Sequence, residues 1–139
     1  MFSFGRNSQE QLSSCDKNLQ AVMQLAIKRT TVDFGISEGH RTPQRQLELY
    51  AQGRTKPGNI VTSVKVSKHN GSPSLAVDIF AYVNGKAVWD QAHMCLVAGV
   101  ILACADELRI KIRWGGNWDG DGEIISDQNF IDLPHFELL

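Results

Sequence analysis

The apolar run from Leu75 to Tyr82 constrains the fold of this chain more than any other segment. It is rich in residues that favour strands, and the Asn84-Gly85 pair after it is a strong hairpin signal, so that Lys86–Trp89 returns as a second strand. One residue does not fit an apolar strand, because the carboxylate of Asp78 would cost several kcal/mol to bury without a partner. The run therefore predicts an antiparallel sheet and a partner for Asp78.

Other periodicities predict helices and short strands around this hairpin. Apolar residues at helical spacing follow Ser8, which can cap a helix, and Thr42-Pro43 places proline in the first turn of another. The pattern predicts one α+β domain over residues 1–139, with a mainly antiparallel sheet flanked by helices. We expect helices at 8–29, 43–52 and 90–108, further strands at 34–38, 110–114 and 133–138, and loops at 53–74 and 115–123.

Length and charge exclude several classes of protein. A chain of 139 residues fits one domain and needs no disulfides to fold, and Cys15, Cys95 and Cys104 lack paired spacing. The net charge is −1 and no basic patch is visible, so we expect no nucleic-acid partner. No segment is long and apolar enough to span a bilayer, and the N-terminus lacks the apolar core of a signal peptide. We therefore expect synthesis in a reducing cytoplasm and no membrane partner.

Two short segments combine histidine with a carboxylate. In the first, His69 stands in a loop and Asp78 in the apolar strand after it; in the second, His135 stands in a strand three residues after Asp132. Two histidines and one carboxylate are a usual ligand set for catalytic zinc that leaves a position for water. Asp132 is then near enough to act as general base toward that water.

Each of these residues also has an ordinary interpretation. A single histidine is usually exposed or hydrogen-bonded, and Asp78 alone could be a strand-end cap or an ion-pair partner. In the last strand, His135 and Glu137 share one face and Phe136 shares the other with Leu138. What favours a metal site is the combination of three candidate ligands in apolar or tightly turned surroundings.

The two segments resemble the LAS-type zinc peptidases, which include VanY-like D-alanyl-D-alanine carboxypeptidases and phage L-alanyl-D-glutamate endopeptidases. The family pattern is SxHxxGxAxD, followed near the C-terminus by an acidic residue three positions before a histidine. The similarity covers about residues 35–138, and the chain departs from it by two extra residues around Ser72-Pro73, which a loop can absorb. The matching residues are Ser67, His69, Gly71, Ala76, Asp78, Asp132 and His135, with further similarity in Ser37–Thr42 and from Gln46 to Thr55.

The resemblance implies a fold like that of hedgehog and D-Ala-D-Ala peptidase domains, and a role for each matched residue. Zinc would be held by His69, Asp78 and His135, and Asp132 would take the proton from water and return it to the leaving amine. Arg41 would bind a substrate carboxylate or stabilise the oxyanion, the alternative being a structural ion pair. Ser67 would bind substrate or orient a ligand, the alternative being loop structure.

The function expected from the resemblance is that of a phage-type endolysin that cuts the L-alanyl-D-glutamate bond of peptidoglycan stem peptides. Such an enzyme would be a monomer stored in the host cytoplasm and would reach the cell wall after holin-type release. One alternative is a D-alanyl-D-alanine carboxypeptidase or dipeptidase with the same site and a different pocket. Another is a non-catalytic zinc-containing binding module like the hedgehog signalling domain.

A second metal site is suggested by the Gly-Asp-rich loop. Oxygen ligands at alternate positions, with glycine at the sixth position and isoleucine at the eighth, resemble the start of an EF-hand calcium loop. The twelfth position is Gln128, which has no carboxylate, although Asp127 beside it could substitute. The alternative is a plain solvated turn. The candidate calcium ligands are Asn117, Asp119, Asp121 and Glu123.

Overall fold

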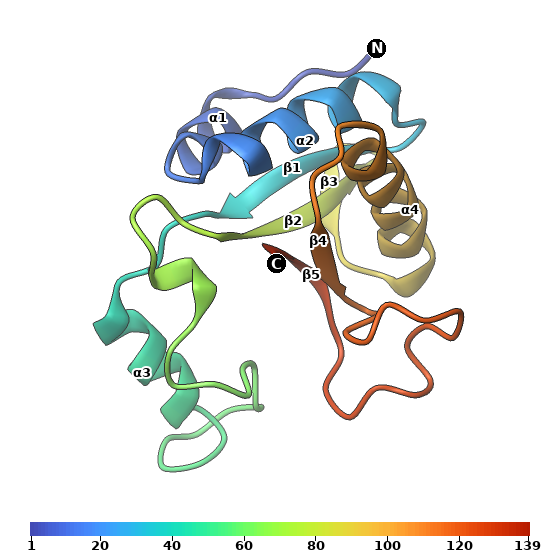
Figure 1. The fold of residues 1–139 in the computed structure, drawn as a ribbon. Helices are drawn as coiled ribbons and strands as arrows, with labels where there is room; N and C mark the ends of the chain where they lie inside the picture. The colour runs from blue at the N-terminus through green and yellow to red at the C-terminus, as the bar shows by residue number, and fades with distance from the viewer.

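A five-stranded antiparallel sheet forms the centre of the protein in the computed structural model, which describes all residues from 1 to 139 (Figure 1). The strand order is β1-β2-β5-β4, and β3 pairs with the end of β2. Asn84 and Gly85 both have positive φ, as a two-residue hairpin turn requires, so the predicted hairpin is confirmed. The strands are β1 (Asp33–Glu38), β2 (Ala76–Val83), β3 (Lys86–Val88), β4 (Ile112–Gly115) and β5 (Asp132–Leu138).

Three of the four α-helices share one apolar core with the sheet. Buried residues of α1, α2 and α4 form a continuous cluster with those of β1, β2, β4 and β5, whereas α3 lies apart from that core (Figure 1). None of the helices combines the length and apolar character needed to cross a bilayer. The helices are α1 (Arg6–Ser13), α2 (Lys17–Arg29), α3 (Pro43–Ala51) and α4 (Gln91–Glu107), and the 3₁₀ helix η1 spans Lys68–Asn70.

The prediction of a single helix over residues 8–29 was wrong, because the structure breaks it between α1 and α2. Backbone bonds to Ser74 interrupt the helical ladder there: Ser74 donates to the Ser14 carbonyl, and Asp16 donates to the Ser74 carbonyl. The Asp16 side chain then caps α2. Ser8, the predicted cap, lies inside α1, where its hydroxyl accepts a bond from a backbone N–H of β1. A contact with a distant loop thus overrides a continuous helical pattern.

The register between β2 and β5 positions the polar residues of the sheet. Asp78 on β2 lies directly opposite His135 on β5. Their neighbours Val77, Ile79 and Phe136 are buried in the apolar core. Because side chains alternate between the two faces of a strand, Asp78 and His135 point away from that core. The same sheet therefore builds the core on one face and a polar site on the other.

Candidate metal centre and catalytic cleft

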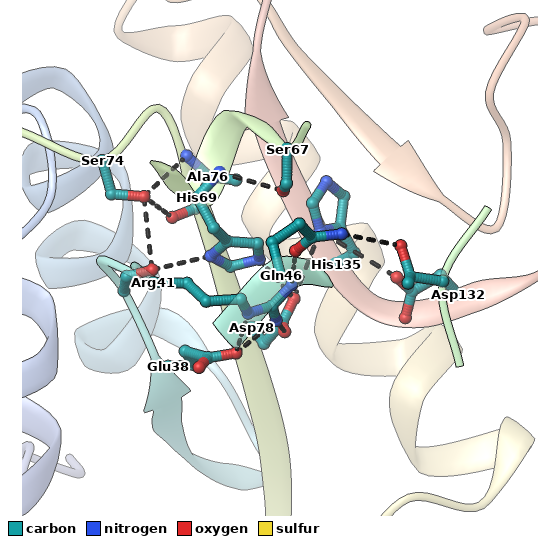
Figure 2. A network of polar contacts seen from close by, with 12 residues as sticks. Glu38, Arg41, Gln46, Ser67, His69, Ser74, Ala76, Asp78, Asp132 and His135 are labelled. Carbon is teal, nitrogen blue, oxygen red and sulfur yellow. Dashed lines mark hydrogen bonds and ion pairs between the residues drawn. The ribbon is translucent and has the colours of Figure 1, made fainter. Parts of the chain in front are cut away.

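Two strands and one short helix bring three metal-ligand candidates together. The carboxylate oxygen Oδ1 of Asp78 lies 3.2 Å from Nε2 of His69 and 3.2 Å from Nδ1 of His135. One donor atom from each residue lies within 4.8 Å of the other two. Figure 2 shows the three side chains pointing toward one another, with Asp132 beside His135. We call these three residues the ligand group.

The loop before β2 fixes His69 in one orientation. Its Nδ1–H donates to the Gly39 carbonyl at 2.7 Å, and its backbone N–H donates to the Ser67 hydroxyl at 3.1 Å. Ser67 and Asn70 form a reciprocal cap on η1, so Ser67 has a structural role beside the site. Since a carbonyl only accepts, Nε2 of His69 is the nitrogen left to face Asp78.

Burial and hydrogen bonds shift the pKa values of Asp78 and His135. Burial acts to raise the pKa of Asp78, but hydrogen bonds from His135 and His69 outweigh it and hold that pKa well below its usual range. Burial acts to lower the pKa of His135, but hydrogen bonds with Asp78 and Glu137 raise it to about 9. The buried Asp78 carboxylate therefore has the partner that the apolar strand predicted.

Asp132 has the position and the pKa of a general base. Its Oδ2 lies 4.0 Å from Nδ1 of His135, and its side chain is 29% exposed. Burial and the nearby charge of Asp78 raise the pKa of Asp132 to about 6, against a partial opposing effect of His135. A carboxylate with a raised pKa accepts a proton more effectively near neutral pH than an ordinary one.

The start of β5 is shaped by close contact with Gly115. The register of β4 and β5 jumps here, so that Gly115 lies opposite Asp132 although Trp114 lies opposite Phe136. A Cβ atom on Gly115 would lie 2.0 Å from the carbonyl oxygen of Asp132 and 3.0 Å from its Cβ. Only glycine allows this approach, which sets where Asp132 stands.

We predict that Gly115→Ala lowers turnover roughly 10²-fold, because a displacement of about 1 Å at a catalytic group has an effect of this size. Metal content should not change, because the ligand group lies outside the contact. The measurement is kcat on a peptide that the wild type cuts, with metal analysis of the same sample. Gly99→Ala on α4 is the matched control, since a Cβ there meets nothing within 4 Å. Equal turnover in the two variants would contradict the role given to Gly115.

Arg41 lies against the ligand group, and most of its donors are already engaged. Its Nε donates to Glu38 at 2.9 Å, its Nη1 to Gln46 at 2.6 Å, and its Nη2 to Asp78 at 3.4 Å as well as to Glu38. A guanidinium has five N–H donors, so these four bonds leave one on Nη1. The structural ion pair considered for Arg41 is therefore present, with one donor to spare.

The ligand group lies in a cleft of about 840 Å³ between two loop regions. In Figure 1, α3 with the segment after it lies on one side and the loop between β4 and β5 on the other. Trp118, from the second side, has its ring centroid 5.5 Å from that of His135, with the two ring planes tilted by 43°, and donates its Nε1–H to a backbone carbonyl. Both walls also present apolar side chains, among them Val64, Val66 and Phe130. The cleft is large enough for a peptide beside the ligand group.

The loop between β4 and β5 gathers a second set of carboxylates. Oxygens of Asp119, Asp121 and Asp127 lie within 4.8 Å of one another, and all three residues are exposed. The Oδ1 atom of Asn117 is buried without a hydrogen-bond partner. The carboxylate of Glu123 is outside this set and accepts a bond from Ser126.

The donor set of the ligand group fits a catalytic metal. Two imidazole nitrogens and one carboxylate oxygen suit zinc, and each histidine has its second nitrogen held by a hydrogen-bond acceptor, as metal-ligating histidines generally do. The cleft leaves space next to the group for water and substrate. The three residues therefore form a candidate metal site whose side chains are already held by hydrogen bonds.

Three residues beside the site, Glu38, Gln46 and Glu137, were not singled out as site residues in the sequence. Glu38 and the fully buried Gln46 hold Arg41. Gln46 also donates to Thr62 and to the Val64 carbonyl, and so fixes one wall of the cleft. Glu137 contacts His135 and Arg113. Strand alternation places Glu137 on the same face as His135, and Glu38 and Gln46 fall within the two further segments of family similarity.

Comparison with known proteins places these features in a family context. The profile of the family described as "Phage L-alanyl-D-glutamate peptidase" matches residues 1–139. The L-alanyl-D-glutamate peptidase of Escherichia phage T5 is 32% identical over 141 aligned residues, which cover 99% of this chain and 98% of that protein.

Two bacterial proteins are also similar. The peptidoglycan L-alanyl-D-glutamate endopeptidase CwlK of Bacillus subtilis (strain 168) is 32% identical over 114 residues, which cover 78% of this chain and 62% of that protein. The crystal structure of the Serratia marcescens L-Ala D-Glu endopeptidase ChiX superposes with a TM-score of 0.78 at 28% identity, covering 99% of this chain and 90% of that one. The similarity to ChiX extends over the whole fold described above.

Proposed function

The chain belongs to the phage L-alanyl-D-glutamate peptidase family, and on that premise we propose that its ligand group holds a catalytic zinc ion for which Asp132 is the general base. The protein is an L-alanyl-D-glutamate endopeptidase that acts on peptidoglycan. The observation that carries the proposal is the position of Asp132, 4.0 Å from Nδ1 of His135 at the edge of the ligand group.

In this mechanism the protein residues orient the substrate and move the proton. A bound zinc ion would polarise the scissile carbonyl and lower the pKa of a bound water. Asp132 accepts the proton of the attacking water and returns it to the leaving amine. The free Nη1–H of Arg41 binds a substrate carboxylate, while its Nη2 donates to Asp78. Ser67 acts by orienting His69 through the cap of η1.

The proposed reaction is tested with two synthetic stem peptides analysed by mass spectrometry. Zinc-loaded protein should cut the peptide that contains L-alanyl-D-glutamate and release a new amine on D-glutamate. A peptide whose only susceptible bond is D-alanyl-D-alanine should remain intact, which separates this activity from the carboxypeptidase alternative. Release of terminal D-alanine, or of no fragment by zinc-loaded protein, would contradict the proposal.

We predict that kcat/KM falls as the pH decreases through the pKa of Asp132, about 6. The sign follows from its role, since only the ionised carboxylate can accept a proton. A cation bound at the ligand group stabilises that ionised form, so about 6 is the upper limit for the midpoint of the acid limb. The measurement is a pH profile of kcat/KM with zinc saturation verified at each pH. A rate that stays constant or rises toward acid pH would rule out a carboxylate base.

We further propose that the loop from Asn117 to Asp127 binds calcium. The proximity of Asp119, Asp121 and Asp127 and the unpartnered oxygen of Asn117 support this, because calcium takes several oxygen ligands from one loop. Calorimetry with Ca²⁺ should show binding that Asp121→Asn abolishes and Asp106→Asn on α4 leaves intact. Turnover should rise with calcium, since the loop leads to Asp132 and carries Trp118. Absence of binding, or binding unaffected by Asp121→Asn, would indicate a solvated turn.

The state and route of the protein are also proposals. A monomer is supported by the fact that every donor of the ligand group comes from one chain, and light scattering of the zinc-loaded protein tests it. Storage in the host cytoplasm and release through holin-type pores is supported by the phage family. Host lysis on expression should then require co-expression of a holin, and rapid lysis without one would contradict this route.

A further inference from the structure

Glu137 contacts Nε2, the second ring nitrogen of His135, and its carboxylate lies at the centre of a cluster of charged side chains. Oε1 of Glu137 lies 2.8 Å from Nε2 of His135. Its other oxygen, Oε2, accepts from Arg113 at 2.8 Å and lies 3.3 Å from Nζ of Lys68. The Glu137 side chain is only 9% exposed. A carboxylate buried to this degree is positioned by its partners rather than by solvent.

The contact of Glu137 decides which nitrogen of His135 is available to a metal. Both ring nitrogens of His135 face carboxylates, which only accept hydrogen bonds: Nδ1 faces Asp78 at 3.2 Å and Nε2 faces Glu137 at 2.8 Å. A metal at the ligand group would take the lone pair of Nδ1, and Glu137 would then accept the one hydrogen that remains, on Nε2. A ring without this contact could carry its hydrogen on either nitrogen and turn away from the group.

Glu137 is itself fixed from two directions. On β4, Arg113 is its direct cross-strand partner. From η1, Lys68 reaches it from the position next to His69 and also donates to the carbonyl of Leu138. Lys68 therefore links the segment that carries one histidine ligand to the strand that carries the other.

We propose that Glu137 is the positioning residue of the metal site, fixing the tautomer of His135 and, through Lys68, the spacing between the two histidine ligands. The inference rests on the proposed function, because it requires zinc at the ligand group. It concerns a residue outside the ligand group. Its effect should therefore appear in metal binding and in the state of the His135 ring, separately from the chemistry of Asp132.

The test is zinc affinity, measured by competition with a chelator, for wild type and four variants. Glu137→Ala should weaken binding roughly 10–100-fold, the usual effect of losing such a partner, and Glu137→Gln, which keeps an acceptor, should weaken it less. Glu107→Gln is the matched control, because Glu107 also pairs with an arginine, Arg29, but on the exposed surface. Lys68→Met separates the effect of positioning from that of charge. Removing a nearby cation would by charge alone strengthen zinc binding. Losing the contact between Lys68 and Glu137 should instead weaken it, which is the result that the proposal predicts.

A spectroscopic readout distinguishes positioning from a general loss of stability. In zinc-loaded wild type, long-range ¹H–¹⁵N spectra should show His135 with its hydrogen on Nε2, protected from exchange. The Glu137 variants should lose this protection, and with Co²⁺ in place of zinc their visible absorption should shift while the control matches wild type. Unchanged affinity and spectra in folded Glu137→Gln and Glu137→Ala would overturn the inference. Failure of wild type itself to bind zinc would instead overturn the zinc assignment, and with it the premise.

Discussion

Asp132→Asn should lower kcat/KM roughly 10²–10⁴-fold while the protein keeps its full complement of zinc. The amide is nearly the same size as the carboxylate, so the backbone contact with Gly115 and the cleft should be preserved. What is lost is the ability to take a proton next to His135, from which Asp132 is separated by 4.0 Å. The measurement is hydrolysis of a stem peptide together with metal analysis of the same preparation.

The comparison variant for this result is Asp106→Asn, which makes the same chemical change on the exposed surface of α4. It should match wild type in both turnover and zinc content. Loss of a general base should reduce activity at least about 10²-fold. If Asp132→Asn retains more than about a tenth of wild-type activity, another group takes the proton. If it loses zinc, Asp132 belongs to the metal site itself.

Removal of the metal should abolish peptidase activity and lower the melting temperature by roughly 10–15 °C, without unfolding the protein at room temperature. A ligand at about a thousand times its Kd stabilises a protein by about 4 kcal/mol, and each kcal/mol corresponds to about 3–4 °C for a domain of this size. The metal-free domain should stay folded, because Asp78 keeps ion pairs with His69, His135 and Arg41. Treatment with a chelator, followed by calorimetry and activity assays, measures both effects.

Restoration by metal identifies the ion. Zn²⁺ should recover activity and melting temperature together, whereas Mg²⁺, which prefers oxygen ligands in octahedral geometry, should recover neither. His69→Ala provides a genetic counterpart, since it removes a ligand that is only 1% exposed and should reproduce the metal-free state. Full activity after complete removal of metal would exclude the proposed mechanism.

The predictions from sequence succeeded where neighbouring residues determine the local structure and failed where a contact between distant segments determines it. The hairpin at Asn84-Gly85 and the cap of α3 at Thr42 depend on neighbouring residues alone, and both are present. The strand containing Asp78 was predictable from its apolar neighbours, and so was the need of its carboxylate for a partner. The break between α1 and α2 depends on Ser74, which no helical periodicity could reveal.

The same distinction applies to the site. Spacing and family resemblance suggested the ligand group and Asp132, because they fall in two compact segments. The partners of Arg41 were not predictable, since Gln46 meets it only through the packing of α3 against the cleft wall. Likewise, Arg113 reaches Glu137 only because of the register between β4 and β5, which the sequence does not specify.

The pairing of β2 with β5 links catalysis to correct folding. Because side chains alternate, a slip of β5 by one residue would exchange Phe136 for His135 and Glu137, burying charge in the core and exposing a ring in the cleft. A chain with this register shift would therefore be unstable as well as inactive. The ligand group therefore assembles in the same register that buries Phe136. The loop around Ser72-Pro73 should tolerate an insertion, whereas a single residue inserted within β5 would disrupt both the apolar core and the active site.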